Sequence, residues 1–115
     1  MQIGVIGPFG TTNGKVSIEF PAEMVRKAER VGELLAEKSV VVMCGGDDKA
    51  GIIEAVARGV KRKNGMLVGF LVGSDKSGAM KYVDIAIPTG MWYGGREYVL
   101  VLSCDSVIVI GGGSG

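Results

Sequence analysis

Glycine-rich segments are the parts of this sequence whose residue types and spacing could support chemistry. The most concentrated one, Gly111 to Gly115, directly follows the apolar segment Ser106–Ile110. Because glycine has no Cβ atom, its backbone can adopt positive φ and bring N–H groups close to an anion. We therefore predict a phosphate site at Gly112, Gly113, Ser114 and Gly115. A flexible tail without a ligand is the alternative, since glycine-rich segments also form linkers.

A second glycine-bearing turn, Gly45 and Gly46, follows the apolar run Ser39–Cys44 and precedes a helical pattern. We expect its amides to bind phosphate as well. Asp47 and Asp48 come next, and two roles are open for them. Aspartate just before a helix is an ordinary N-terminal cap, which is the simpler role, whereas a carboxylate can also bind a metal ion or a ribose hydroxyl.

The loop after the first apolar run, Gln2–Ile6, offers hydroxyl groups at Thr11 and Thr12. A loop in this place lies at the ligand edge of a parallel sheet, so we include both threonines in the predicted site. The glycines at positions 4, 7 and 10 are spaced by three throughout, which is not the dinucleotide fingerprint Gly-x-Gly-x-x-Gly. We therefore do not expect NAD.

Two aromatic residues and a cation follow the fourth apolar run, at Trp92, Tyr93 and Arg96. The planar guanidinium of Arg96 suits phosphate recognition. Trp92 has two possible roles. It could stack on a planar base, or it could cover the core together with Tyr93, because aromatic side chains bury large areas.

Composition excludes several classes of function. The chain has no histidine, which removes histidine triads and histidine zinc motifs. The two cysteines fit small buried hydrophobes in a reduced, cytoplasmic protein, and we expect no metal and no cofactor. A net charge of +1 gives no overall field for nucleic acid or membranes, and no apolar run is long enough to span a bilayer.

Hydrophobic patterning predicts the elements that must position these residues. We expect strands at Gln2–Ile6, Ser39–Cys44, Met66–Val72, Tyr82–Ile87 and Ser106–Ile110, and helices at Pro21–Lys38, Ile52–Lys63 and Glu97–Cys104. Uninterrupted apolar strands are typical of a parallel sheet buried on both faces. The alternation predicts one Rossmann-like α/β domain over residues 1–115, a doubly wound parallel sheet in three α/β/α layers with right-handed crossovers.

Surface patterns on the predicted helices suggest how they are used. The charged face of the first helix, with a Glu23–Lys27 pair, is expected to be solvated. We expect the basic run Lys61–Lys63 to complement a helix dipole rather than to bind phosphate. The helix Glu97–Cys104 is apolar almost all round, so we expect it to lie between the sheet and a second subunit of a homodimer or larger homo-oligomer.

Taken together, these motifs resemble the cytokinin-activating phosphoribohydrolases, also called possible lysine decarboxylases, and the related molybdenum-cofactor carrier proteins. That family has an arginine, a helix, a strand and then Pro-Gly-Gly-x-Gly-Thr-x-x-Glu. Arg96, Gly112, Gly113 and Gly115 fall at the matching positions, although Gly111 replaces the proline.

The resemblance also covers the earlier turn and extends through essentially the whole chain. The family motif Gly-Gly-Gly-x-x-Gly-Leu-Met matches Gly45, Gly46 and residues 51–53, with Asp47 in place of the third glycine. It implies binding of a nucleoside 5′-monophosphate or similar phosphorylated heterocycle. In the phosphoribohydrolases, the arginine and the motif glutamate are taken to act on the N-glycosidic bond, so the resemblance makes Arg96 our candidate catalytic residue.

Catalysis depends on residues that this sequence does not contain. It ends at Gly115, before the threonine and glutamate of the motif, so we expect a longer natural chain, truncated here after its fifth strand, and binding without hydrolysis. A non-enzymatic carrier or sensor of a cofactor such as molybdopterin is the alternative. A protein-interaction domain with vestigial pockets is a third hypothesis, and the balanced charge disfavours a DNA-processing role.

Overall fold

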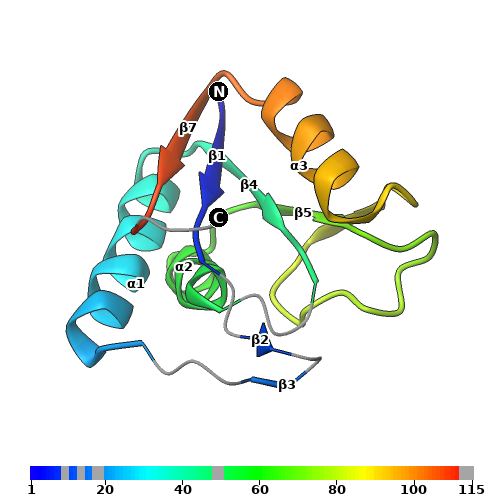
Figure 1. The fold of residues 1–115 in the computed structure, drawn as a ribbon. Helices are drawn as coiled ribbons and strands as arrows, with labels where there is room; N and C mark the ends of the chain where they lie inside the picture. Colours follow the sequence, from blue (N-terminus) through cyan, green and yellow to red (C-terminus); the bar gives the residue numbers. More distant parts are fainter. Residues whose placement is uncertain (9–10, 13–14, 17–19, 48–50, 112–115) are drawn as a thin grey trace.

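A five-stranded parallel sheet with helices on both faces forms the molecule (Figure 1). The computed structural model describes residues 1–8, 11–12, 15–16, 20–47 and 51–111. The strand order is β6-β5-β4-β1-β7, with bounds β1 Gln2–Ile6, β4 Val41–Gly45, β5 Leu67–Leu71, β6 Ile85–Pro88 and β7 Ser106–Val109. The predicted Rossmann-like α/β fold is thereby confirmed.

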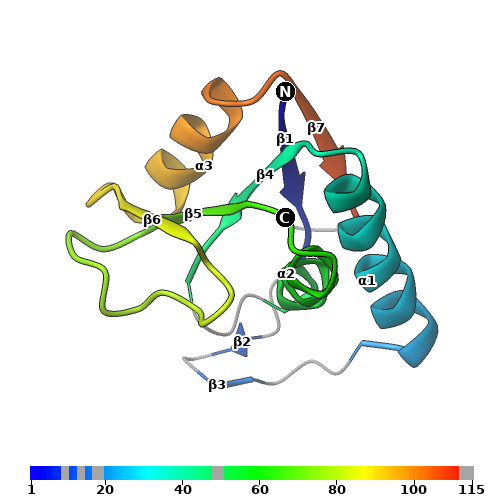
Figure 2. The same cartoon turned by 180° about the vertical axis from the view of Figure 1, so that it is seen from behind.

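Three helices and a small hairpin complete the described structure. The helices are α1 Ala22–Glu37, α2 Ile52–Arg62 and α3 Trp92–Leu102, and the hairpin pairs β2 Thr11–Thr12 with β3 Lys15–Val16. Figures 1 and 2 show α1 and α2 side by side on one face of the sheet and α3 on the other. In the described part of the chain, no helix combines the length and apolar character needed to cross a membrane.

Alternation along β4 distributes its side chains between the two faces. Val42 and Cys44 pack into the cluster that α1 and α2 cover, whereas Met43 packs into the cluster of Leu100 on α3. The same alternation turns Gly45, the last residue of β4, toward α3. Gly45 therefore faces the side chain of Arg96 on α3.

Glycines bring α1 and α2 into close contact. A Cβ on Gly59 would lie 2.0 Å from the carbonyl oxygen of Glu29, and one on Gly32 would lie 2.1 Å from that of Val56. The two backbones can therefore approach only without side chains at the crossing. This crossing fixes both helices against the face of the sheet.

The charged face of α1 differs from our expectation. The pair between Glu23 and Lys27 forms on the exposed surface, at 3.3 Å. The prediction of a wholly solvated face is wrong, because the close crossing brings acids of α1 to cations of α2. The inter-helix ion pairs are Glu29–Arg58, Glu29–Arg62, Glu33–Arg62 and Glu37–Lys63.

An irregular segment, residues 72–84, connects β5 to β6 in place of a helix. Met80 and Val83 pack into the same cluster as α2, so this segment covers part of that face. Asp84 ends it by accepting hydrogen bonds from the backbone of Leu67 and from Lys61. β6 consequently begins at Ile85 and not at Tyr82 as predicted.

The third helix begins five residues earlier than predicted, at Trp92 instead of Glu97. The backbone N–H of Trp92 is bound by the carbonyl of Val72 at 3.1 Å, which anchors the first turn despite its glycines. In the single chain, one face of α3 is buried. Arg96 and Leu100 are its buried residues, whereas Tyr98 and Leu102 are 65% and 68% exposed. Coverage by a second subunit stays a prediction.

Candidate functional site

The carboxyl ends of the five parallel strands share one edge of the sheet, and all three helices begin at that edge (Figure 1). The N-cap residues Pro21, Gly51 and Met91 make no side-chain cap hydrogen bond among the described residues. Helix N-termini carry partial positive charge and free backbone N–H groups. The edge therefore combines turns and helix ends of the kind that bind anions.

Arg96 occupies the interior of this region. Its side chain is 1% exposed, because the helical period places Arg96 and Leu100 on the face of α3 that packs against the sheet. Nη1 lies 3.2 Å from Oδ2 of Asp47, and Nη2 lies 3.1 Å from Oε1 of Glu97. A guanidinium removed from water requires such partners, since burial of an unpaired charge costs several kcal/mol, about 3 to 5 when a partner is lost.

Asp47 connects three separate parts of the chain. One oxygen binds Arg96, the other accepts the backbone N–H of Val72 at 3.3 Å, and the backbone of Asp47 pairs with Ala79. The helix-cap role that we predicted for Asp47 is wrong, because the N-cap of α2 is Gly51 and the carboxylate faces the buried cation instead. Asp48 lies outside the described residues.

No metal site accounts for Asp47 in the described ranges, where no group of three or more histidine, cysteine, aspartate or glutamate side chains is close enough to hold an ion. The carboxylate is instead an acceptor for N–H donors. Its ion pair with Arg96 is the principal electrostatic feature of the edge.

Gly45 and Gly46 have clear packing roles. A Cβ on Gly45 would lie 2.2 Å from Nη1 of Arg96, so the guanidinium rests directly against the backbone at the end of β4. A Cβ on Gly46 would lie 2.6 Å from the Cα of Gly69 on β5. Both glycines are therefore needed for close approach, and a role of their amides in phosphate binding stays a prediction.

Trp92 and Tyr93 are exposed at the start of α3. Trp92 is 68% exposed, so the alternative in which the two rings cover the core is wrong. Its φ of 60° lies in the left-handed region, which is uncommon for a bulky residue and is found preferentially at functional sites. The two rings meet edge to face with centroids 5.2 Å apart, and the ring of Tyr93 lies 5.6 Å from Cζ of Arg96.

The remaining predicted residues are only partly described. Gly112, Gly113, Ser114 and Gly115 lie outside the described residues. Gly111 has a φ of 75°. It lies close to Pro8, which follows β1, and to Met24 at the start of α1. Thr11 and Thr12 form β2, and the structure describes their backbone only.

Lys61 and Cys44 have structural surroundings that explain them. Lys61 donates to the carbonyl of Gly65 at 2.8 Å near the C-terminus of α2, in agreement with the predicted complement to the helix end. Burial raises the pKa of the Cys44 thiol to about 12, although the positive charge of Arg96 opposes this shift. Cys44 therefore stays protonated and inert as a nucleophile, as expected of a buried hydrophobe.

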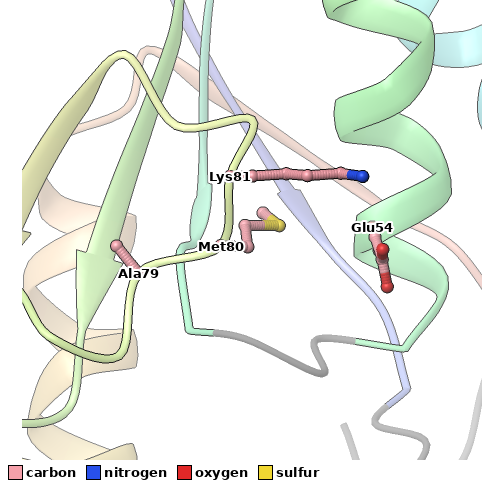
Figure 3. A pocket seen from close by; sticks show the side chains of 4 residues that line it. All are labelled: Glu54, Ala79, Met80 and Lys81. Atoms are coloured by element: carbon pink, nitrogen blue, oxygen red, sulfur yellow. The ribbon is translucent and has the colours of Figure 1, made fainter.

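A pocket of about 410 Å³ lies between α2 and the segment 79–81 (Figure 3). Glu54, Ala79, Met80 and Lys81 line it, and Figure 3 shows the side chain of Lys81 extending toward α2. None of the predicted site residues is among these lining residues. The pocket is therefore separate from the Arg96–Asp47 pair, although Ala79 joins the two through its bridge to Asp47.

The Arg96–Asp47 pair was not found by sequence reasoning. A signal for it existed, because an arginine four residues from Leu100 in a largely apolar helix must share a buried face with it. Such an arginine requires a nearby carboxylate. The sequence alone could not select Asp47 from the other acidic residues.

Known proteins resemble this chain over its full length. The model of the SLOG cluster4 family matches residues 1–115. A protein of Archaeoglobus fulgidus, described as uncharacterized, is 41% identical over 115 residues, which are 100% of this chain and 68% of that protein.

Solved structures of molybdenum-cofactor proteins have the same fold. The molybdenum cofactor binding protein of Rippkaea orientalis superposes with a TM-score of 0.82 and 30% identity, over 98% of this chain and 63% of that one. The molybdenum cofactor carrier protein of Chlamydomonas reinhardtii superposes with a TM-score of 0.79 and 25% identity, over 99% and 64%. The chain thus spans slightly less than two thirds of these proteins, and the expected similarity to cofactor carriers is confirmed.

Proposed function

Since this chain belongs to the SLOG cluster4 family, we propose that it binds a nucleoside 5′-monophosphate or a similar phosphorylated heterocycle at the carboxyl edge of its sheet. One observation supports the proposal: the Arg96–Asp47 pair, the exposed Trp92 and three helix N-termini all lie at that edge. Open parallel sheets hold their ligands in this place.

In this proposal the phosphate occupies the end of the site next to β7 and β1. Gly112, Gly113, Ser114 and Gly115 supply amides, with Thr11 and Thr12 from the loop after β1. The position of Gly111 supports this location, because Gly111 lies next to Pro8, which follows β1, and to Met24 at the start of α1. Phosphate is favoured at a helix N-terminus by the dipole and by free N–H groups.

The heterocycle then occupies the end next to β4 and β5. Two inter-strand spacings separate β7 from β4, which is about 10 Å. A mononucleotide spans a distance of this order between its phosphate and its base. The exposed ring of Trp92 provides a surface for stacking, which is worth roughly 1 to 3 kcal/mol per base where it has been measured on single strands.

Hydrolysis of the N-glycosidic bond is a further part of the proposal for the complete protein. That reaction adds water to C1′ of the ribose, while the base leaves with a proton. The family pattern places the required glutamate after Gly115, and Arg96 would orient the substrate. Inside the described region, Asp47 and Glu97 already form ion pairs with Arg96, so neither is a free general base.

A non-enzymatic carrier of a phosphorylated cofactor is the second candidate. The superposed Rippkaea and Chlamydomonas proteins are described as binding or carrying molybdenum cofactor. The engagement of Arg96 by two carboxylates also favours binding over catalysis. Under this candidate the ligand leaves the protein unchanged.

One calorimetric titration tests both candidates. AMP and GMP are titrated into the protein, and the mixtures are then assayed for free base. We expect micromolar binding of at least one nucleotide, about −8 kcal/mol. Release of base supports the hydrolase, binding without release supports the carrier, and no binding of either nucleotide contradicts the proposal.

A matched pair of variants locates the phosphate. Gly113→Asp places a negative charge in the proposed phosphate site and should abolish binding. Gly73→Asp adds the same charge at the same edge, where a Cβ meets nothing within 4 Å, and should leave affinity unchanged. Equal affinity of the two variants would contradict a phosphate site at Gly113.

We also propose that the protein is a cytoplasmic homodimer or larger homo-oligomer. The exposed apolar residues of α3, Tyr98, Val101 and Leu102, support this proposal. Light scattering coupled to size exclusion tests it, and a mass near 12.0 kDa for this chain would contradict it.

A further inference from the structure

Asp47 has hydrogen-bonding capacity beyond its contacts in the structure. An ionised carboxylate offers about four lone-pair sites. Among the described residues, Oδ2 accepts from Arg96 and Oδ1 accepts from the backbone of Val72, one donor for each oxygen. The side chain of Asp47 is 19% exposed, so it is not closed off from solvent at the carboxyl edge.

The charges around Asp47 favour donors over anions. Arg96 contributes one positive charge, and Asp47 and Glu97 contribute two negative charges, within 3.2 Å of the guanidinium. Among the described residues the cluster is therefore net negative, and a phosphate placed against these side chains would meet like charge. Neutral N–H donors would instead gain hydrogen bonds to a charged acceptor, which are stronger than those between neutral groups.

The orientation of Asp47 is fixed from three sides. Arg96 holds one oxygen, Val72 holds the other, and the bridge to Ala79 fixes the backbone. The ring of Tyr93 lies 5.6 Å from Cζ of the same Arg96 and meets the exposed Trp92, so the aromatic pair and the carboxylate share one guanidinium as a neighbour. In ligand sites, a few precisely placed polar groups among aromatic side chains fix the orientation of the ligand and give specificity. A fixed carboxylate near aromatic rings can do this for a planar ring system by accepting hydrogen bonds from its edge.

We propose that Asp47 is a specificity-determining residue that accepts two hydrogen bonds from a 2-amino-4-oxopyrimidine edge. Guanine and pterins present such an edge, with a ring N–H and an amino N–H side by side. Adenine lacks it, because its corresponding ring nitrogen is an acceptor. Arg96 acts as a positioning residue that holds the carboxylate. This inference rests on the proposed function and names the class of heterocycle.

A ligand series tests the inference without altering the protein. GMP, IMP and AMP share the phosphate and ribose, and IMP differs from GMP only by the missing 2-amino group. We expect GMP to bind about tenfold more tightly than IMP, because one hydrogen bond to a charged group is lost. AMP should bind more weakly than IMP. Equal affinities for the three nucleotides would overturn the role of Asp47 while leaving the proposed function intact.

A matched pair of variants assigns the preference to its residue. Asp47→Asn replaces an acceptor by a donor, so the ratio of GMP to IMP affinity should fall to near one. Asp75→Asn is the control, since Asp75 lies on the exposed loop after β5 and binds Ser77 there. Its ratio should equal that of the unmodified protein. An unchanged ratio in folded Asp47→Asn overturns the inference, and no nucleotide binding at all overturns both it and the proposed function.

Discussion

Nη1 of Arg96 lies 3.2 Å from Oδ2 of Asp47, although 49 positions separate these residues in the sequence. The pair joins α3 to the carboxyl end of β4, and Asp47 extends the connection to the loop after β5 through Val72. The side chain of Arg96 is almost completely buried, whereas that of Asp47 is 19% exposed. Arg96 is thus a buried cation at the carboxyl edge, and the carboxylate of Asp47 is the part of the pair that solvent reaches.

Replacement of Arg96 by alanine should destabilise the protein by about 3 kcal/mol, because it leaves a cavity and an uncompensated Asp47. The free energy of unfolding in urea measures this loss. Lys27→Ala is the control, since Lys27 forms an exposed pair with Glu23 and should cost about 0.5 kcal/mol or less. Similar losses for both variants would show that Arg96 does not depend on its buried pair.

Replacement of Gly45 by alanine should displace the guanidinium of Arg96. The added Cβ would lie 2.2 Å from Nη1, and relief of such a clash in a packed region costs about 1 to 3 kcal/mol. Gly94→Ala is the matched control in the first turn of α3, where a Cβ meets nothing within 4 Å. It should stabilise the helix by up to about 1 kcal/mol. Denaturant unfolding of both variants should therefore give shifts of opposite sign.

Stability should fall in acid partly through Asp84. Burial of Asp84 opposes ionisation, but hydrogen bonds from Lys61 and from the Leu67 backbone outweigh it and lower the pKa below its ordinary value of 3.8. A carboxyl with a lowered pKa in the folded state contributes stability above its unfolded pKa and loses it as pH falls through the folded value. Asp84→Asn should therefore lose less stability than the unmodified protein between pH 7 and a pH below 3.8.

Lys61→Met provides the second measurement for this prediction. It removes the ammonium that lies 2.7 Å from Asp84, so it should also reduce the acid-dependent loss of stability. Unfolding curves recorded across the acid range give the comparison. If neither variant changes the dependence on pH, the pair is not its source.

The two thiols should differ in their reaction with iodoacetamide. Cys44 is fully buried and its pKa is raised to about 12, mainly by burial, whereas Cys104 is only partly buried. Because the thiolate is the reactive species, we expect Cys104 to be modified first in the folded protein at pH 8.5. Peptide mass spectrometry after timed quenching measures the order. Early modification of Cys44 would contradict its burial, and urea should equalise the two rates.

Several elements could be predicted closely because their signals are local. β1 was predicted at its observed bounds, and α1 and α2 agree with prediction to within a residue or so at each end. Asn64 and Gly65 follow the end of α2, with Asn64 at a φ of 57° and the amide of Gly65 donating to the Val60 carbonyl. Helix periodicity and stop residues act over a few positions, so a single segment contains the information.

The start of α3 could not be predicted in the same way. Gly94 and Gly95 weaken the helical pattern, and the first turn is fixed by a hydrogen bond from Trp92 to Val72, which comes from another part of the chain. The apolar character of Tyr98 and Leu102 likewise does not say which face of the helix meets the sheet, and both residues are exposed in the single chain. Contacts with residues distant in the sequence determined both the start of α3 and the choice of its buried face.

The sequence by itself determined the α/β class and the parallel sheet, because uninterrupted apolar strands are properties of short segments, and the edge for a ligand stays its prediction. Only the tertiary structure decided what Gly45 and Asp47 do there. Strand order and the packing of α3 bring Arg96 against the end of β4, and a buried guanidinium must rest on a residue without a side chain and pair with a nearby carboxylate. Those requirements arise only when segments distant in sequence come into contact.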